Sequence, residues 1–151
     1  MIGVFPFLIL WQSLVSLAEA TGRELGTIGR AVIDGLGGID QFDLEVKKAV
    51  AHASALRDNI PAECVGLHEG GGGVVAKICF ADGVCWADKM YANSMAYKNV
   101  YYANKAMAYA RQYCPAIPIP EPKAWYRNKI HHYVTGWVEG NQRWDRALSL
   151  N

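Results

Sequence analysis

The strongest constraint on the fold is a hairpin signal in the middle of the chain. Residues 74–80 are rich in β-branched and aromatic side chains, and residues 84–90 form a second candidate strand. Asp82-Gly83 lies between the two stretches, and an Asp-Gly pair in that position is typical of a tight turn. The sequence therefore predicts two antiparallel strands joined at this turn.

The turn also predicts which residues face each other across the hairpin. A two-residue loop at Asp82-Gly83 pairs Phe80 with Cys85, Ile78 with Ala87 and Ala76 with Lys89. Directly paired residues share a face, so one face is predicted to carry Val74, Ala76, Ile78, Phe80, Cys85, Ala87 and Lys89. Lys77 and Asp88 would form a charge pair on the opposite, solvent-facing side. A single lysine, Lys89, then projects from an otherwise apolar face and needs an explanation.

The segments around the hairpin complete a sheet. Residues 64–67 favour a short strand, which leads into the run Gly70-Gly71-Gly72-Gly73. Asn93 can cap a long helix over residues 94–113, which Cys114-Pro115 ends. Two more strands are expected over residues 123–126 and 130–137. The predicted fold is α+β, with about five antiparallel strands, one long helix after the third strand and N-terminal helices before the sheet.

Three segments are predicted to precede the sheet. Residues 1–20 are apolar, and Ala18-Glu19-Ala20 fits a signal-peptidase site, but no Lys or Arg precedes the apolar run. A signal peptide, which would make the chain secreted, and an amphipathic helix in a cytoplasmic chain both fit this segment, whereas a membrane span is not expected. Residues 21–39 are rich in glycine and are expected to be a linker. Residues 40–61 favour a helix capped by Asp43.

Composition excludes one class of partner. The 151-residue chain has 15 Lys and Arg against 14 Asp and Glu, a net charge of +1, so an electrostatic nucleic-acid binder is not expected. Hydrophobic residues make up 52% of the chain, which is enough for one domain with its own core. The cysteines, Cys64, Cys79, Cys85 and Cys114, show no metal-ligand spacing. Reduced thiols are expected for all of them, whereas a secreted chain could form two bridges.

Three segments together resemble the small lobe of aminoglycoside phosphotransferase-type kinases, in particular the fungal phosphotransferase-like group. LHEGGGGVVAKICFADGVCWADKMY is similar to the family's glycine-loop hairpin, YCPAIPIPEPKAW to the segment after its helix, and HHYVTGWVEG to its fifth strand and hinge. The resemblance covers residues 62–140 and implies a protein-kinase-like small lobe there. Residues 141–151 would be a truncated tail.

The resemblance implies an ATP site on this lobe. The implicated residues are Gly70, Gly71, Gly72, Gly73, Val74, Ala87, Lys89, Gly136, Trp137 and Val138. The glycine backbone would approach phosphates, and Lys89 matches the third-strand lysine that reaches them. Ala87 matches the small residue against the adenine, and Val74 matches the apolar residue after the glycine loop. The backbone of residues 136–138 would be the hinge that hydrogen-bonds the adenine edge.

The chain departs from the family pattern in two ways. No Asp or Glu occurs between Asp88 and Glu121. Lys89 therefore lacks the helix glutamate that is its usual partner, and Asn104 lies nearest to the expected position. The family's catalytic loop and magnesium-binding aspartate would lie beyond Asn151. No catalytic residue and no metal ligand is therefore predicted, and magnesium ligands are expected to be absent.

These features lead to three functional expectations. The first is a truncated, pseudokinase-like phosphotransferase relative, inactive alone and with at most weak ATP binding. The second is a protein–protein interaction module, in which a partner covers the lobe face that the large lobe would otherwise meet, with residues 141–150 in the contact. The third is a small secreted protein with a vestigial kinase resemblance. No acceptor substrate is predicted, because acceptor specificity in the family resides in the large lobe.

Overall fold

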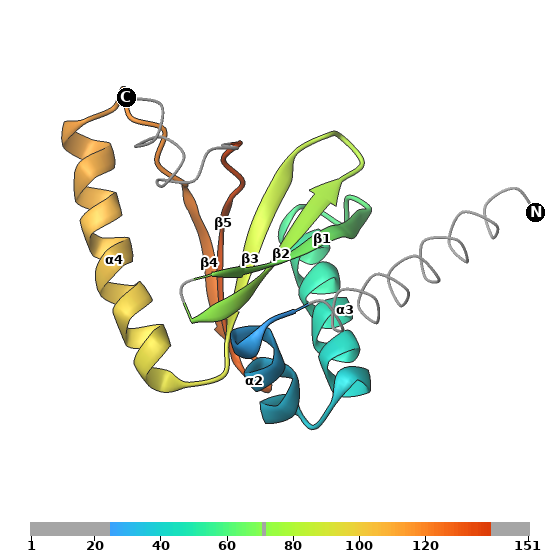
Figure 1. Ribbon diagram of the computed structural model, residues 1–151. Helices are drawn as coiled ribbons and strands as arrows, with labels where there is room; N and C mark the ends of the chain where they lie inside the picture. The colour runs from blue at the N-terminus through green and yellow to red at the C-terminus, as the bar shows by residue number, and fades with distance from the viewer. Residues whose placement is uncertain (1–24, 71, 140–151) are drawn as a thin grey trace, which may run out of the picture.

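The structure is a computed structural model that describes residues 25–70 and 72–139 (Figure 1). Its elements, in chain order, are α2 (Thr27–Leu36), α3 (Ile39–Leu56), β1 (Ala62–Gly70), β2 (Gly73–Phe80), β3 (Cys85–Tyr91), α4 (Ser94–Tyr113), β4 (Pro122–Arg127) and β5 (His131–Gly136). The segments 1–20 and 141–151 lie outside the described residues, so the expectations for a signal peptide and for a contact tail stay predictions.

The strands form one antiparallel five-stranded sheet in the order β1-β2-β3-β5-β4. α2 and α3 lie on one side of this sheet, and α4, which follows β3, lies on the other (Figure 1). The expected α+β fold, with about five antiparallel strands and a long helix after the third, is confirmed. Among the described helices, none combines the length and the apolar character that crossing a bilayer requires.

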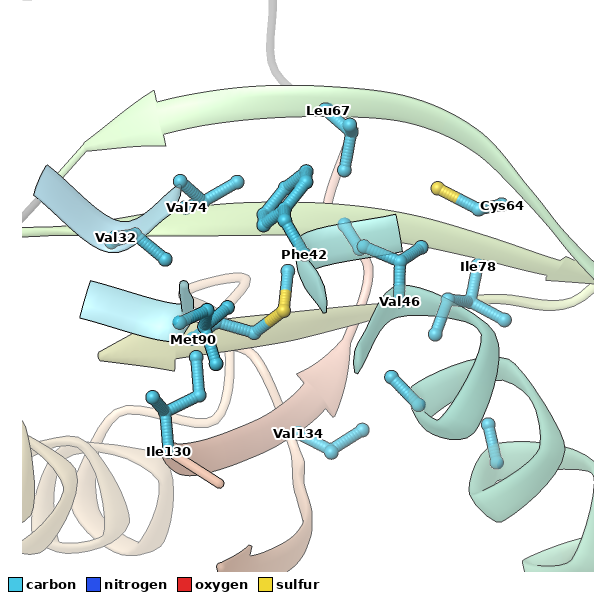
Figure 2. Close-up of a cluster of buried hydrophobic side chains, with 14 of the residues drawn as sticks. Val32, Phe42, Val46, Cys64, Leu67, Val74, Ile78, Met90, Ile130 and Val134 are labelled. Carbon is cyan, nitrogen blue, oxygen red and sulfur yellow. The ribbon is translucent and has the colours of Figure 1, made fainter. Parts of the chain in front are cut away.

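The hydrophobic core lies between the sheet and the helices α2 and α3 (Figure 2). Fully buried side chains from both layers fill it, among them Phe42, Val46, Val74, Ile78 and Met90. Phe42 and Val46 are four residues apart on α3 and therefore lie on the same face of the helix. Burial of one side chain of this kind contributes about 1.5–3 kcal/mol. This packing determines which face of the sheet is closed and which is left for other contacts.

The segment expected to be a flexible linker, residues 21–39, contains α2 instead. Its buried residues Gly29, Val32, Ile33 and Leu36 join the core side of the sheet. The Gly29 N–H donates a hydrogen bond to the Glu69 carboxylate of β1 at 2.5 Å, which satisfies one free N–H of the first turn. A Cβ at position 29 would collide with Leu25 and Glu69, so this glycine permits the contact. Tertiary packing thus outweighs the low helix propensity of glycine.

α3 begins earlier than the predicted cap. The helix starts at Ile39. Gly37 and Gly38 precede it with φ angles of 97° and 116°, which are not helical and therefore separate α2 from α3. Asp43 lies inside the helix and forms an ion pair with Lys47, with 2.7 Å between Oδ2 and Nζ. The expected helix over residues 40–61 is confirmed as far as Leu56, but residues 57–61 are not helical and the predicted cap is wrong.

The loop between β2 and β3 has three residues rather than the two that were expected. The Phe80 N–H donates to the Val84 carbonyl at 2.8 Å, and the Gly83 N–H donates to the Phe80 carbonyl at 2.9 Å. Gly83 has a φ of 88°, the left-handed conformation that closes a three-residue hairpin loop. Phe80 therefore lies opposite Val84, and the ladder is shifted by one residue from the predicted register.

This shift moves residues between the faces of the sheet. The observed pairs are Val74 with Met90, Val75 with Lys89, Ala76 with Asp88, Lys77 with Ala87, Ile78 with Trp86 and Cys79 with Cys85. Val74 therefore faces the core, whereas Ala87 and Lys89 lie on the opposite face. Asp88 is buried on the core side, so the predicted solvent-facing pair of Lys77 with Asp88 is wrong.

The same register brings two cysteines together. Cys79 and Cys85 lie directly opposite each other and form a disulfide. Cys64 is a buried free thiol and Cys114 an exposed one. The expectation of four reduced thiols is therefore wrong, because the three-residue loop places one cysteine of β2 against one of β3.

Candidate functional site

The candidate site lies on the sheet face opposite the core, which we call the Lys89 face. Its members from β2, β3 and β5 are Val75, Lys77, Ala87, Lys89, Tyr133 and Thr135. The pairing arranges them in two rows across the strands: Val75, Lys89 and Tyr133 form one row, and Lys77, Ala87 and Thr135 form the other. Directly paired residues share a face, so each row is a line of neighbouring side chains.

The two rows confirm one sequence-based grouping and correct another. Ala87 and Lys89 share a face, as the alternation along β3 indicated. Val74 does not share it, since it is fully buried among the core residues on the other side. Val75, rather than the predicted Ala76, lies opposite Lys89. The error follows from the turn, because a slip of one residue sends every side chain of a strand to the other face.

Lys89 is a half-buried cation with no carboxylate partner in the described part of the chain. Its Nζ lies 5.4 Å from the centroid of the Tyr133 ring. Burial lowers the pKa of Lys89 below its ordinary value. An ammonium group that has lost water and has no counter-ion is stabilised by an incoming anion. Lys89 is therefore a positive charge that no carboxylate among the described residues compensates.

Asn104 of α4 is connected to Lys89 indirectly, because it is hydrogen-bonded to Tyr133, whose ring lies next to the lysine. The Tyr133 hydroxyl donates a hydrogen bond to Asn104 Oδ1. Burial raises the pKa of Tyr133 to about 12, so its hydroxyl stays neutral at physiological pH. Asn104 is the residue nearest to the position that the resemblance gives to a glutamate. An amide at that position supplies hydrogen bonding without the negative charge that would neutralise Lys89.

The predicted glycine loop divides into residues with different environments. Gly70 pairs with Gly73 at the end of the β1–β2 ladder, and a Cβ on Gly70 would meet nothing within 4 Å. Gly72 has a φ of 84°, which favours glycine in the turn. A Cβ on Gly73 would run into the Met90 carbonyl oxygen, so Gly73 is required by packing against β3. Gly71 lies outside the described residues. Gly70 and Gly72 are thus the described glycines whose backbone a ligand could approach.

The row of Ala87 and Thr135 is covered and carries an unsatisfied polar atom. Ala87 is 6% exposed and Thr135 is 1% exposed. Thr135 Oγ1 is buried without a hydrogen-bond partner in the described structure, and so is Trp137 Nε1. A buried polar atom left unpaired costs about 1–3 kcal/mol. This row of the Lys89 face therefore combines a buried alanine with two polar atoms whose hydrogen-bonding capacity no described group uses.

Trp137 crosses the Lys89 face from the chain that follows β5. Its indole ring lies with its centroid 4.7 Å from Lys77 Nζ and 5.8 Å from the ring centroid of His68 on β1. Lys77 also forms an ion pair with Glu139, with 3.3 Å between Nζ and Oε1. The indole therefore extends from the end of β5 across β3 and β2 toward β1.

The predicted hinge uses two of its N–H groups within the protein. The Gly136 N–H donates to the Glu121 carbonyl at 2.8 Å, and the Trp137 N–H donates to the Cys85 carbonyl at 3.0 Å. These two N–H groups are therefore already used by hydrogen bonds within the protein, and the role of this backbone as an adenine-binding hinge stays a prediction. The N–H of Val138 has no backbone acceptor among the described residues. Val138 remains the hinge residue with a backbone donor for a ligand.

A second polar cluster lies on the core side of the sheet. His132 Nδ1 is 2.8 Å from Asp88 Oδ1, and His132 Nε2 is 2.8 Å from Glu45 Oε1. The Tyr126 hydroxyl donates to Asp88 at 2.8 Å, and the Asn128 amide donates to Glu45 at 3.1 Å. The cluster joins α3 to β3, β4 and β5.

This cluster is structural rather than open to a ligand, since the side chains of His132, Asp88 and Glu45 are each 1% exposed. Burial by itself would lower the pKa of His132, but the hydrogen bonds and charges of Asp88 and Glu45 raise it above its ordinary value. An imidazole that faces a carboxylate at each nitrogen is held as the doubly protonated cation.

Sequence reasoning missed four residues of the Lys89 face: Val75, Lys77, Tyr133 and Thr135. Alternation back from Trp137 through Thr135 to Tyr133 was available as a signal for β5. For Val75 and Lys77, the signal would have been a three-residue loop at the hairpin. Among residues 25–70 and 72–139, no group of three His, Cys, Asp or Glu could hold a metal ion.

Comparisons of the chain with protein-family models, with curated proteins and with solved structures find no match.

Proposed function

We propose that this protein holds a nucleotide on the Lys89 face, as a kinase-like small lobe of the aminoglycoside-phosphotransferase type, and that no described residue takes part in phosphoryl transfer. The observation that carries the proposal is Lys89, a half-buried cation on the third strand of the sheet with no carboxylate partner among the described residues. The strand order and the helix after the third strand support it, as does the glycine turn between β1 and β2.

The residues of the face fit the parts of a nucleotide. Lys89 would bind phosphate oxygens, with the backbone of Gly70 and Gly72 near them. Ala87 and Val75 would offer an apolar platform to the base, and Thr135 Oγ1 has hydrogen-bonding capacity that no described group uses. ATP would supply a phosphoryl group, but the described residues include no cluster of carboxylates that could hold magnesium beside it. The proposal is therefore binding without catalysis.

Thermal unfolding of the full chain with ATP tests the proposal. A ligand that binds only the folded state stabilises it, by about 1.4 kcal/mol at ten times its Kd, and that raises the Tm by several degrees in a small domain. We expect millimolar ATP to raise the Tm with or without magnesium. Lys89→Met keeps the apolar stem but removes the charge, and it should abolish the shift.

The matched control is Lys48→Met, which removes an exposed lysine of α3 on the core side of the sheet. This variant should keep the full ATP shift. A folded chain whose Tm does not respond to millimolar ATP would reject the proposal. An equal shift in the wild type and in Lys89→Met would also reject it, because binding would then lie elsewhere.

A second function, partner binding, is favoured by the outer surface of α4. None of residues 97–113 is buried, and the helix carries Tyr102, Tyr109 and Tyr113 at 67%, 66% and 62% exposure. Its charged residues are Lys98, Lys105 and Arg111, and no Asp or Glu lies between Asp88 and Glu121. A surface of tyrosines and cations without anions fits an acidic protein segment that also carries apolar side chains.

A designed helical peptide with glutamates on one face and leucines on the other is a direct probe of this surface. Fluorescence anisotropy should detect binding that weakens with added salt and is lost in a Tyr109→Ser, Tyr113→Ser double variant. The same peptide with lysines in place of its glutamates should not bind. Equal binding by both peptides, or none by either, would reject an acidic partner for α4.

A further inference from the structure

Trp137 lies where the proposed site would receive a base. Its backbone is held at the start of β3 by the hydrogen bond from its N–H to the Cys85 carbonyl, two residues before Ala87. Its ring lies over Lys77, with 4.7 Å from Nζ to the centroid, and Lys77 is the direct cross-strand partner of Ala87. The indole therefore lies beside the end of the Lys77 side chain, and Lys77 shares its row with Ala87 and Thr135.

The contacts around the ring are those that a flat aromatic ligand would make. A cation lies over its face, the imidazole of His68 lies beside it with centroids 5.8 Å apart, and the platform residues Ala87 and Thr135 are nearly inaccessible. Cation–π and ring–ring contacts of this kind stabilise an indole and a purine alike. Trp137 Nε1 itself has no hydrogen-bond partner among the described residues. The ring is thus held by its faces and not by its polar edge.

We propose that Trp137 is a built-in occupant of the base platform, so that a nucleotide binds only when the indole swings away from Ala87. This inference rests on the nucleotide site proposed above and adds a regulation to it. The closed form, with the indole on the platform, competes with the base but leaves Lys89 accessible to phosphate. Glu139 stabilises the closed form, because its ion pair with Lys77 holds the lysine under the ring.

The closed form has a quantitative consequence. The apparent Kd of a ligand equals the intrinsic Kd divided by the populated fraction of the competent form. If the open form is about a tenth of the population, removal of the indole improves the affinity roughly tenfold. The improvement should apply to adenosine as well as to ATP, since both carry the base. Inorganic triphosphate lacks a base, and its affinity should not change.

Isothermal titration of the full chain with ATP, adenosine and triphosphate provides the test. Trp137→Ala should bind ATP and adenosine roughly tenfold more tightly than the wild type and bind triphosphate equally. Val84→Ala, an exposed position just after the hairpin loop and next to Cys85, is the control and should leave all three affinities unchanged. Weaker ATP binding in Trp137→Ala would overturn the proposal, because the indole would then be a stacking partner of the base. Unchanged binding would overturn it as well.

The design separates the two proposals. If neither the wild type nor Trp137→Ala binds ATP, the nucleotide site itself fails, whereas a wild type that binds and is not improved refutes only the role of Trp137. A fluorine label on tryptophan gives an independent readout that needs no unfolding-prone variant. The resonance that disappears in Trp137→Phe should shift on addition of ATP to the labelled wild type. A Trp137 resonance that does not respond while ATP binds would overturn the proposal.

Discussion

At the scale of single residues, His132 is the side chain whose chemistry matters most for the fold. It lies between Asp88 of β3 and Glu45 of α3, at 2.8 Å from each. Two buried carboxylates could not remain together without a cation between them, because the desolvation of each charge is costly. The protonated His132 therefore offsets the cost of burying Asp88 and Glu45, and its two hydrogen bonds connect α3 to the sheet.

The raised pKa of His132 predicts how stability depends on pH. The folded protein keeps the imidazole protonated at pH values above the unfolded pKa of about 6.5. The contribution of His132 to the free energy of unfolding is therefore complete below that pH. It is lost as the pH rises from there through the folded pKa, with a slope of about 1.4 kcal/mol per pH unit. Urea unfolding of the protein between pH 6 and pH 9 should show this decline.

The groups that face His132 allow a control. They are Glu45, Asp88 and Tyr126, and burial raises the pKa of Tyr126 far above this window. Asp88→Asn removes one of the two charges that raise the His132 pKa, so the decline should end at a lower pH and be smaller in this variant. The neighbouring His131 has a pKa below its ordinary value, chiefly because of burial, so its own contribution changes stability only below the unfolded pKa of about 6.5. A stability profile that is flat above pH 6.5 in the wild type would contradict the charged state of His132.

At the scale of elements, the two hairpins of the sheet are specified by different means. β2 and β3 are joined by the disulfide between Cys79 and Cys85. The two-residue loop predicted from the sequence would have placed Cys85 opposite Phe80, so the disulfide excludes it. β1 and β2 have no covalent link among the described residues. Their turn depends instead on glycines, of which Gly73 packs under the Met90 carbonyl.

Gly73 and Gly70 form a matched pair for testing this difference. Gly73→Ala would force a Cβ into the Met90 carbonyl, and overpacking of that kind costs about 1–3 kcal/mol. Gly70→Ala places its Cβ in open space and should change the free energy of unfolding by less than about 0.5 kcal/mol. Urea midpoints of the two variants measure both effects. Equal destabilisation would mean that both glycines serve the backbone of the turn rather than packing on β3.

At the scale of the whole molecule, the two sides of the sheet are closed to different degrees. α2 and α3 bury apolar side chains on the core side. α4 is attached on the other side through a few ring contacts, such as Tyr97 with His131 at 4.2 Å and with Trp125 at 5.1 Å between centroids. On this side Lys89 is half-buried and the outer tyrosines of α4 are exposed, whereas Ala87, Tyr133 and Thr135 are nearly inaccessible. Both proposed functions use this side.

Much of the fold could be predicted from the residues in sequence, because its signals are local. The Asp-Gly turn, the glycine run and the proline after Tyr113 lie within a few residues of the elements they delimit. Alternation along β3 was enough to place Ala87 with Lys89 on one face. The residues predicted to share a face were thus right for Ala87 and Lys89 but not for Val74, and their role as a site stays a prediction.

The sequence by itself determined the order and type of the elements from β1 onward, since turn chemistry and strand composition act over short distances. Only the tertiary structure decided the hairpin register, the helix α2, the position of Trp137 and the ion cluster of His132. The register depends on one residue more or less in the turn, because either loop length accepts an Asp-Gly pair. For the other features the reason is the distance along the chain: Glu45 and His132 are 87 residues apart, and Gly29 and Glu69 are 40 apart. No local pattern encodes such pairs, because their free energy arises only when the layers pack and exclude water.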